Sequence, residues 1–507
     1  MGMSLSRERE PAAAVTPPWP AALAARGRLA AESAWSLVLG GALLATLLLL
    51  GYEATFYPAR QSGVFFPVSL GTALALAGFV AHLGIGRARR QLSLAWPGLW
   101  FPLVFALFHF ASLGDRSWYA PLYLPRAWAV SVAGFLAWMA GYDLVRGRLL
   151  PQRGARALSR GRPLDPRELR RITGWGYLLF LAGLGLQFLL IGQIGLGAFL
   201  FQAYSQSKEV LSTEGGGALV YAFGLGRILC ATAVIAAVVP SCLAEGRLFQ
   251  GRVFPLVLLL YVAGLFLTGD RSELAVVLFP LLLCRHFFVK PIPWRQAILL
   301  AAAGWLFLTG AKGIRETKSL ETARTFVAGP GALERAADEL GFTLDTVIRS
   351  MTLVPERQPY FDGMTYVHAA ARAVPALGRE EGLGSFVSSS WITRETAPEV
   401  YARHGGLGFS IVAEAYINFG TLGVPLLLFL LGLLHGRTER WICGPAVPVW
   451  LAMAWMVLEV RLLYHVRNTT VSYVRGSIWM LLLLAFLYWV CKLDRGLRTA
   501  PRPGGPV

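Results

Sequence analysis

The chain of 507 residues has few charged side chains and few cysteines. Only 15% of its residues are Asp, Glu, Lys or Arg, whereas 55% are hydrophobic and the mean hydropathy is +0.54. This balance excludes an ordinary soluble protein and is typical of a chain that crosses a membrane many times. The five cysteines form no C-x-x-C motif, and none lies in the long polar stretch from Lys312 to Gly423. The sequence therefore indicates neither a disulfide framework nor a cysteine metal site.

Several motifs of well-known enzymes are also absent. The chain has no G-x-x-x-x-G-K-[ST], no H-E-x-x-H, no G-x-S-x-G and no outer D-x-D. It therefore supports neither an ATPase, a zinc protease nor a metal-bound nucleotide-sugar site. The net charge of +18 does not predict a nucleic-acid partner, because 42 of the 47 basic residues are Arg in a chain whose composition is typical of a GC-rich genome.

Long apolar runs occupy most of the chain. A helix needs about 20 mostly apolar residues to cross the hydrocarbon core of a membrane. Twelve such runs predict an all-α polytopic membrane protein, and they lie near 35–52, 64–84, 95–113, 127–145, 174–194, 218–240, 253–268, 274–288, 296–310, 409–434, 446–463 and 476–493. The seventh to ninth runs are short, so their ends are the least defined.

Basic residues collect in alternate loops, which predicts the orientation. If the N-terminus is cytoplasmic, the inner segments hold 27 Lys and Arg, nine of them between Arg146 and Arg171. We therefore expect a multi-pass membrane protein with both termini cytoplasmic. The expected parts are an N-terminal tail (1–34), nine helices (35–310), an extracytoplasmic loop acting as a lid (311–408), three helices (409–493) and a C-terminal tail (494–507). Within the lid, the spacing of apolar residues predicts an amphipathic helix at 332–353, on or near the membrane, and a second helix at 364–373.

Ionisable residues gather at the outer ends of the predicted spans. Such groups are costly in a membrane unless they are paired or solvated, so each is a functional candidate. The cluster comprises Asp270, Arg271, Glu273, Lys312, Arg315, Glu414, Arg461, His465, Arg467 and Arg475. Glu414 and Asn418 stand at positions i and i+4, as do Arg461 and His465, so each pair lies on one helix face. This mixture suits an anionic, membrane-anchored substrate that is processed at the outer leaflet.

Two of these features also have structural interpretations. The GDRSE segment is typical of a turn followed by a capped helix, with Asp270 or Ser272 as N-cap and Glu273 in the first turn. Arg227, deeper in its helix, could be a buried partner of Glu414 or Glu459.

Three segments carry a family resemblance. FDGMTYVHAAARAVPALG at Phe361–Gly378, GFSIVAEAYINFGTLGV at Gly408–Val424 and TGDRSELAVVLFPLLL at Thr268–Leu283 follow one another as in Wzy-type polysaccharide polymerases. The sequence resembles this O-antigen repeat-unit polymerase family over roughly 260–480. It departs from the family at Pro375, where V-P-A lacks the basic residue that often follows the proline.

The resemblance implies a metal-independent membrane glycosyltransferase of GT-C-like architecture without a cofactor. Its substrates would be undecaprenyl-diphosphate-linked glycans, and its partners membrane lipid and possible chain-length regulator and flippase proteins. As a hypothesis, the diphosphate would bind Arg271, Lys312, Arg315, Arg461, Arg467 and Arg475. Arg271 would also act in catalysis, with Glu414 or His465 as the base, while Tyr366, Trp391, Tyr416 and Asn418 would contact sugar.

Two alternatives remain open from the sequence. One is another lipid-linked-sugar glycosyltransferase or an O-antigen ligase, for which Glu53 beyond the first span is a candidate acidic residue. The other, of a different class, is a transporter or flippase. It would require inverted repeats or broken helices in matching halves, and neither is evident.

Overall fold

The structure is a computed structural model that describes most of the chain as helices. It describes residues 19–56, 65–88, 97–110, 120–146, 165–195, 216–268, 270–290, 332–374, 386–402, 405–442 and 447–499, with a few single positions between 292 and 304. The helices are α1 (Trp19–Phe56), α2 (Phe65–Ala88), α3 (Pro97–Phe110), α4 (Ala120–Arg146), α5 (Pro166–Ile194), α8 (Gly216–Glu245), α9 (Val253–Thr268), α10 (Arg271–Cys284), the π-helix η3 (Arg285–Val289), α13 (Ala332–Leu353), α14 (Met364–Arg372), α15 (Ser388–Thr396), α16 (Pro398–Ala402), α17 (Ile411–Ile442), α18 (Val449–His465) and α19 (Thr470–Thr499).

Seven of these helices are long and apolar enough to cross a membrane: α1, α2, α4, α5, α8, α17 and α19. Three shorter apolar helices, α3, α9 and α10, match further predicted spans, and α18 matches the run at 446–463. The predicted run at 296–310 lies almost wholly outside the described residues. Exposed leucines along α5 and α17, such as Leu181 and Leu426, suit lipid rather than water. The prediction of a polytopic helical membrane protein is confirmed.

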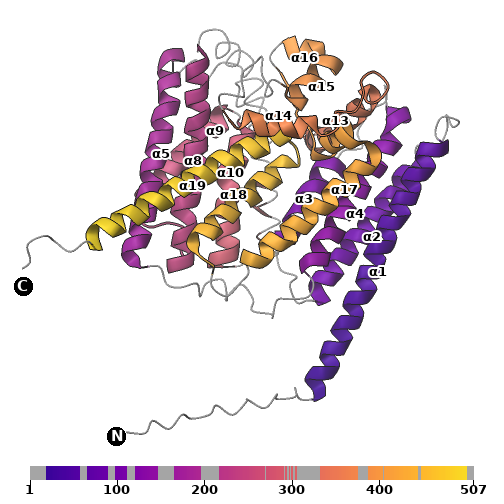
Figure 1. The fold of residues 1–507 in the computed structure, drawn as a ribbon, viewed down its shortest axis with the longest axis horizontal. Helices are drawn as coiled ribbons and strands as arrows, with labels where there is room; N and C mark the ends of the chain where they lie inside the picture. Colours follow the sequence, from indigo (N-terminus) through magenta and orange to yellow (C-terminus); the bar gives the residue numbers. More distant parts are fainter. Residues whose placement is uncertain are drawn as a thin grey trace, which may run out of the picture.

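The centre of the bundle is the pair α4 and α17, which run side by side (Figure 1). Their backbones come very close because glycines stand at the crossing: a Cβ on Gly141 would collide with the Phe429 carbonyl, and one on Gly432 with that of Trp138. Small residues at such contacts are the usual means of close helix packing in membranes. This tight pair is the frame on which both ends of the bundle are built.

At the end of the bundle where α4 and α17 terminate, buried charges pair with one another. The Arg146 guanidinium lies 2.7 Å from Glu439 Oε1 and donates to the Tyr142 hydroxyl at 2.6 Å. The Tyr142 hydroxyl in turn donates to Glu439, and the Glu439 side chain is completely buried. Each charge in this group therefore has a partner, as buried charges require.

Two further buried pairs lie beside this group. His82 Nδ1 is 2.6 Å from Asp143 Oδ2, and His435 Nε2 is 2.7 Å from Glu459 Oε2. The His82 and His435 rings both lie edge-on or tilted against the Tyr142 and Trp138 rings. We call these charged residues, together with Tyr142, the paired network.

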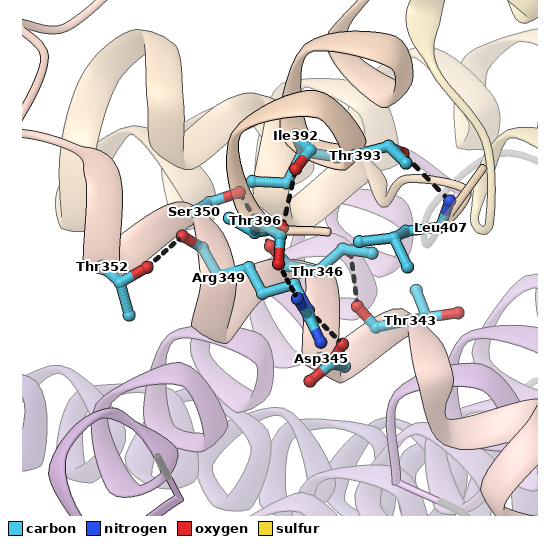
Figure 2. A network of polar contacts seen from close by, with 10 residues as sticks. All are labelled: Thr343, Asp345, Thr346, Arg349, Ser350, Thr352, Ile392, Thr393, Thr396 and Leu407. Carbon is cyan, nitrogen blue, oxygen red and sulfur yellow. Dashed lines mark hydrogen bonds and ion pairs between the residues drawn. The ribbon is translucent and has the colours of Figure 1, made fainter. Parts of the chain in front are cut away.

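At the opposite end, α13 to α16 cover the bundle (Figure 1). The helix predicted at 332–353 is present as α13, and its residues 343–351 are almost entirely buried against the rest of the chain. Its apolar residues pack on α3, α4 and α17, while its polar side contacts α15. Arg349 Nε lies 2.6 Å from Asp345 Oδ2, and Arg349 Nη1 donates to the Thr396 carbonyl at 3.0 Å (Figure 2). The loop thus has an ordered helical framework.

Candidate functional site

Several of the predicted site residues, among them Glu414, Asn418, Arg461 and His465, lie at the end of the bundle covered by α14, which we call the α14 end. Here α10, α17 and α19 begin and α18 terminates, and α14 lies across them (Figure 1). The second helix predicted in the loop, at 364–373, is therefore confirmed. The placement brings segments distant in sequence into one region.

Glu414 lies in the first turn of α17 and is completely buried. Its Oε1 accepts from the Ser388 hydroxyl at 3.0 Å, and its Oε2 accepts from the Thr470 backbone N–H at 2.7 Å. Because Thr470 is the first residue of α19, the carboxylate sits at the positive end of that helix, which favours a negative charge there. Glu414 therefore joins the starts of α15, α17 and α19.

Asn418, one turn further along α17, fixes the start of α14. Its Nδ2 donates to Thr365 Oγ1 and to the Glu414 carbonyl, both at 2.7 Å. Its Oδ1 accepts from the backbone N–H of Gly363 at 3.0 Å. Gly363 has φ 86°, a left-handed conformation that glycine adopts without strain. Glu414 and Asn418, on one face of α17, thus hold the starts of α14, α15 and α19 in place around the site.

His465, the last residue of α18, is nearly buried. Its Nε2 lies 3.4 Å from the Thr470 hydroxyl, and its ring stacks on Tyr473 with centroids 5.1 Å apart. Its Nδ1 makes no hydrogen bond within the part of the chain that the structure describes. Thr470 consequently connects the two candidate bases, through its N–H to Glu414 and through its hydroxyl to His465.

Arg461 lies one turn before His465 and crosses to α19. Its guanidinium donates to the Ser472 carbonyl and lies over the Tyr464 ring at 5.2 Å. A Cβ on Gly476 would collide with this guanidinium, so only glycine leaves room for it here. The position of Arg461 thus depends on a glycine of the neighbouring helix.

The GDRSE segment has the helix-cap structure that its sequence predicted. Asp270 is the N-cap of α10, and its Oδ1 accepts from the Glu273 backbone N–H at 3.1 Å. Its Oδ2 lies 2.5 Å from Arg227, so Glu414 or Glu459 as the partner of Arg227 was a wrong expectation. The reason is that α8 packs against α10, which brings Arg227 to the helix cap. Glu273 belongs to the same group and interacts electrostatically with Arg227 and Arg461.

Arg475 has a different environment. The Arg475 guanidinium lies over the Tyr221 ring, 5.8 Å from the ring centroid. The like charge of Arg372, on α14, acts on Arg475 electrostatically. Within the described residues, no carboxylate acts on Arg475. Two guanidiniums held together repel one another, and a bound anion would remove that cost. Sequence reasoning missed Arg372, although it lies inside the segment that carries the family resemblance.

The remaining predicted cations are placed only in part. The Arg467 guanidinium lies 5.4 Å from the centroid of the Phe108 ring of α3. Arg271 is the first residue of α10, but its side chain is outside the described part of the structure, as are Lys312 and Arg315 altogether.

The predicted sugar-binding aromatic residues differ in exposure. Trp391 is buried and its Nε1 donates to Gln358 at 3.1 Å, while Tyr416 is buried and donates to the Val354 carbonyl at 3.0 Å. Tyr366 is partly exposed, and its ring stacks on Phe419 with centroids 6.1 Å apart. Burial, and then the negative charge of Glu414, raise the pKa of the Tyr366 phenol, which keeps it protonated as a hydrogen-bond donor.

Guanidiniums, a carboxylate and an imidazole together give this region the means to bind an anion and to transfer a proton. Among the residues that the structure describes, no three His, Cys, Asp or Glu side chains come together as a metal site would need.

The comparisons with known proteins place the chain in a family. Residues 246–495 match the family model described as O-antigen polysaccharide polymerase Wzy. No curated protein and no solved structure matches. The match includes α9 to α19 and hence almost every group of the α14 end, and it confirms the resemblance carried by the three segments. Through residues 246–495, the chain belongs to the family of Wzy-type O-antigen polysaccharide polymerases.

Proposed function

We propose that the protein polymerises undecaprenyl-diphosphate-linked oligosaccharide repeat units into a surface polysaccharide. The reaction takes place at the outer face of the bacterial inner membrane, with both termini cytoplasmic and the α14 end outside. The observation that carries the proposal is that Thr470 joins Glu414 and His465 at the α14 end of a chain with a polymerase family match.

The chemistry is the transfer of a growing glycan between two lipid carriers. A hydroxyl oxygen at the nonreducing end of the acceptor unit attacks the anomeric carbon of the donor glycan. The bond from that carbon to the diphosphate oxygen breaks, and undecaprenyl diphosphate leaves with the electron pair. The hydroxyl proton passes to a base and then to water. No metal or cofactor takes part in this scheme, in which fixed guanidiniums stabilise the charge on the leaving group.

We assign each residue a role in this reaction from its contacts. Arg475 and Arg372 bind the leaving diphosphate, with Arg271, Lys312, Arg315, Arg461 and Arg467 as further candidates around it. His465 is our preferred base, since its Nε2 lies 3.4 Å from the hydroxyl of Thr470, the residue whose N–H binds Glu414. Glu414 is a positioning residue, because both carboxylate oxygens hold other helices and one of them binds Thr470, the neighbour of His465.

The sugars require a surface that remains accessible. Tyr366 is partly exposed and is the best placed of the predicted aromatic residues to contact a glycan. Trp391, Tyr416 and Asn418 shape that surface from below through their hydrogen bonds to the protein. A GT-C-like active site under the loop at 311–408, served by a flippase and a chain-length regulator, completes the proposal.

The test uses the full-length protein, purified in lipid nanodiscs and supplied with diphosphate-linked repeat units. We expect a ladder of lipid-linked products that differ by one repeat unit. Transfer of a single block to another acceptor would instead identify a ligase, and movement of the lipid without a new glycosidic bond would identify a transporter. Either outcome contradicts the proposal.

A further inference from the structure

Arg126, on α4, is a partly buried cation that has no role in the reaction proposed above. Its Nη2 donates to the Thr421 hydroxyl of α17 at 3.0 Å, and its guanidinium lies 6.0 Å from the centroid of the Tyr416 ring. Its Nε is buried without a hydrogen-bond partner, and among the described residues Arg126 forms no ion pair with a carboxylate. A cation in this position in a membrane protein is a candidate for binding a ligand.

Arg126 contacts α17 directly after an interruption of that helix. Gly420 has φ 67° and ψ −161°, which is not a helical conformation. A Cβ at this position would lie 3.2 Å from the Tyr360 hydroxyl, so the glycine leaves room for the loop segment that precedes α14. Thr421, which accepts from Arg126, is the first residue beyond the break. Interrupted helices occur in membrane proteins where they are buried in protein or line a cavity, and they often form substrate sites.

The break is also where α17 passes from protein surroundings to lipid. Residues 411–418, before the break, are all buried, whereas Leu422 and Leu426, after it, are 72% and 61% exposed. On α4, the predicted apolar span at 127–145 begins directly after Arg126. Both helices therefore place Arg126 at the membrane boundary. The charged head of a lipid-linked substrate lies at this level, because its chain must remain in the membrane.

Other charged and hydroxyl-bearing side chains lie near Arg126. Tyr123, one turn earlier on α4, donates to the Glu356 carboxylate at 3.2 Å. Arg357, the next residue of the chain, is exposed. The charges of Arg126, Glu356 and Arg357 all act on the Tyr123 hydroxyl, so two cations and one carboxylate share this region. The region therefore has a net positive charge, which favours an anion as its ligand.

Polymerisation brings two lipid-linked glycans to the same face of the membrane, but only the donor loses its diphosphate. The acceptor reacts at its nonreducing end, so its own diphosphate stays one repeat unit away from the base. An acceptor diphosphate therefore needs a cation at the membrane boundary that is separate from the reacting atoms. Arg126 meets this requirement, since it contacts α17 beyond the break, whereas Glu414 lies before the break in the first turn.

We propose that Arg126, together with the Thr421 hydroxyl, binds the diphosphate of the acceptor carrier. This inference rests on the proposed function, because it assigns the second substrate of the same reaction. The phosphate oxygens accept charge-assisted hydrogen bonds from the guanidinium, including one from Nε. The site is built by α4, which lies outside the residues 246–495 that match the family. The phosphate of a bulk phospholipid has the same chemistry, and the experiments below distinguish it from the carrier.

The test compares two acceptors that carry the same repeat unit on the same isoprenoid chain. One is joined to the carrier diphosphate through a methylene group, so it cannot act as a donor, and the other has a neutral linker. The donor is methylated at its own acceptor hydroxyl, so that one transfer takes place. We expect Arg126→Ala to raise KM for the diphosphate acceptor about tenfold at unchanged kcat, because a charge-assisted hydrogen bond is lost. Both constants for the neutral acceptor should keep their wild-type values.

Two variants serve as references for this comparison. Arg126→Lys keeps the charge and should raise KM for the diphosphate acceptor less than Arg126→Ala does. Arg437→Ala, at the other end of the bundle, should change neither acceptor. An equal loss with both acceptors, a fall in kcat alone, or unchanged constants in Arg126→Ala would each overturn the proposal.

A second measurement needs no turnover. Native mass spectrometry of the protein in nanodiscs counts the bound molecules of the methylene-linked acceptor. We expect two on the wild type, one at each diphosphate site, and one on Arg126→Ala. Excess phosphatidylglycerol should displace neither from the wild type. If phosphatidylglycerol displaces one of them, or if Arg126→Ala still binds two, Arg126 does not hold the acceptor carrier.

These outcomes separate the two proposals. If the wild type extends both acceptors and Arg126→Ala has no selective effect, only the acceptor site is assigned wrongly. If the wild type extends neither acceptor, the proposed function itself fails.

Discussion

The charged side chains at the two ends of the bundle differ in their partners. In the paired network, Arg146 has Glu439 at 2.7 Å and His435 has Glu459 at the same distance, deep between α4, α17 and α18. At the α14 end, Arg475 faces Arg372, and no carboxylate of the described chain offsets it. Both ends contain buried or half-buried cations, and Arg475 differs from Arg146 in that the described residues place no carboxylate beside it.

On the proposed function, this difference distinguishes charges that hold the helices together from charges that bind the substrate. A buried pair whose members satisfy each other contributes to a unique packing of helices, and removing one member leaves an uncompensated charge. Two like charges held together raise the free energy of the empty protein, and an anion that binds between them lowers it. The group of Arg227, Asp270, Glu273 and Arg461 lies between these extremes, since it is balanced but close to the site.

The largest effect is expected in the paired network. Arg146→Ala leaves the Glu439 carboxylate buried without its cation, which should lower the free energy of unfolding by about 3–5 kcal/mol. Thermal unfolding in detergent measures this loss. The double variant Arg146→Met with Glu439→Leu removes both charges and should recover most of the stability. If the single and double variants unfold alike, the network does not work as a set of pairs.

At the α14 end, Arg475→Ala should lower the activity without lowering the stability. The variant removes a repulsion from the free protein, so its unfolding temperature should be unchanged or raised. Its polymerisation rate should fall about 100-fold, because a cation that stabilises the leaving group is lost. Arg437→Ala, an exposed arginine over Trp441 at the other end, is the control and should retain full activity. A loss of stability with normal activity would make Arg475 a structural residue.

A smaller effect is expected at the crossing of α18 and α19. Gly476→Ala introduces a methyl group where the Arg461 guanidinium lies, which should cost about 1–3 kcal/mol of stability. Arg461→Ala removes the obstacle, so the methyl group should cost much less in the double variant. Gly192→Ala, where a Cβ meets nothing within 4 Å, provides the control. Additive losses in the double variant would show that the two residues do not interact.

An effect of similar size, but confined to α14, is expected at Asn418. Asn418→Ala removes three hydrogen bonds that hold Gly363, Thr365 and the Glu414 carbonyl, and α14 should loosen by about 1–3 kcal/mol. Hydrogen exchange of the α14 amides measures this local opening. We expect the α14 amides to exchange faster than in the wild type and the α4 amides to exchange at the wild-type rate. Unchanged exchange in α14 would remove Asn418 from the set of positioning residues.

Much of the bundle was predictable because lipid imposes a simple rule on sequence. Apolar runs gave the positions of α2, α9 and α17 closely, since a helix that crosses a membrane must be apolar over its length. Apolar spacing also predicted the helix α13 at 332–353, but not the helices against which it packs. The burial of α13 depends on its contacts with α15 and α17, which are distant in sequence. The spacing of its own apolar residues carries no information about those two helices.

The site was predictable in its location but not in its pairing. Helical spacing put Glu414 with Asn418 and Arg461 with His465, and the structure agrees. It could not pair Arg227 with Asp270 or bring Arg372 to Arg475, because these contacts depend on how separate helices pack. One signal was available: Arg372 lies on the helix predicted at 364–373, within the segment that carries the family resemblance.

The most direct measurement is the affinity of the purified protein for undecaprenyl diphosphate, compared with that for undecaprenyl monophosphate. The wild type should bind the diphosphate at least about tenfold more tightly, because two guanidiniums contact two phosphate groups. Arg475→Ala and Arg372→Ala should each abolish this preference without lowering the unfolding temperature. Equal affinity of the wild type for both lipids, or an unchanged preference in both variants, would contradict the assignment of these arginines to the substrate.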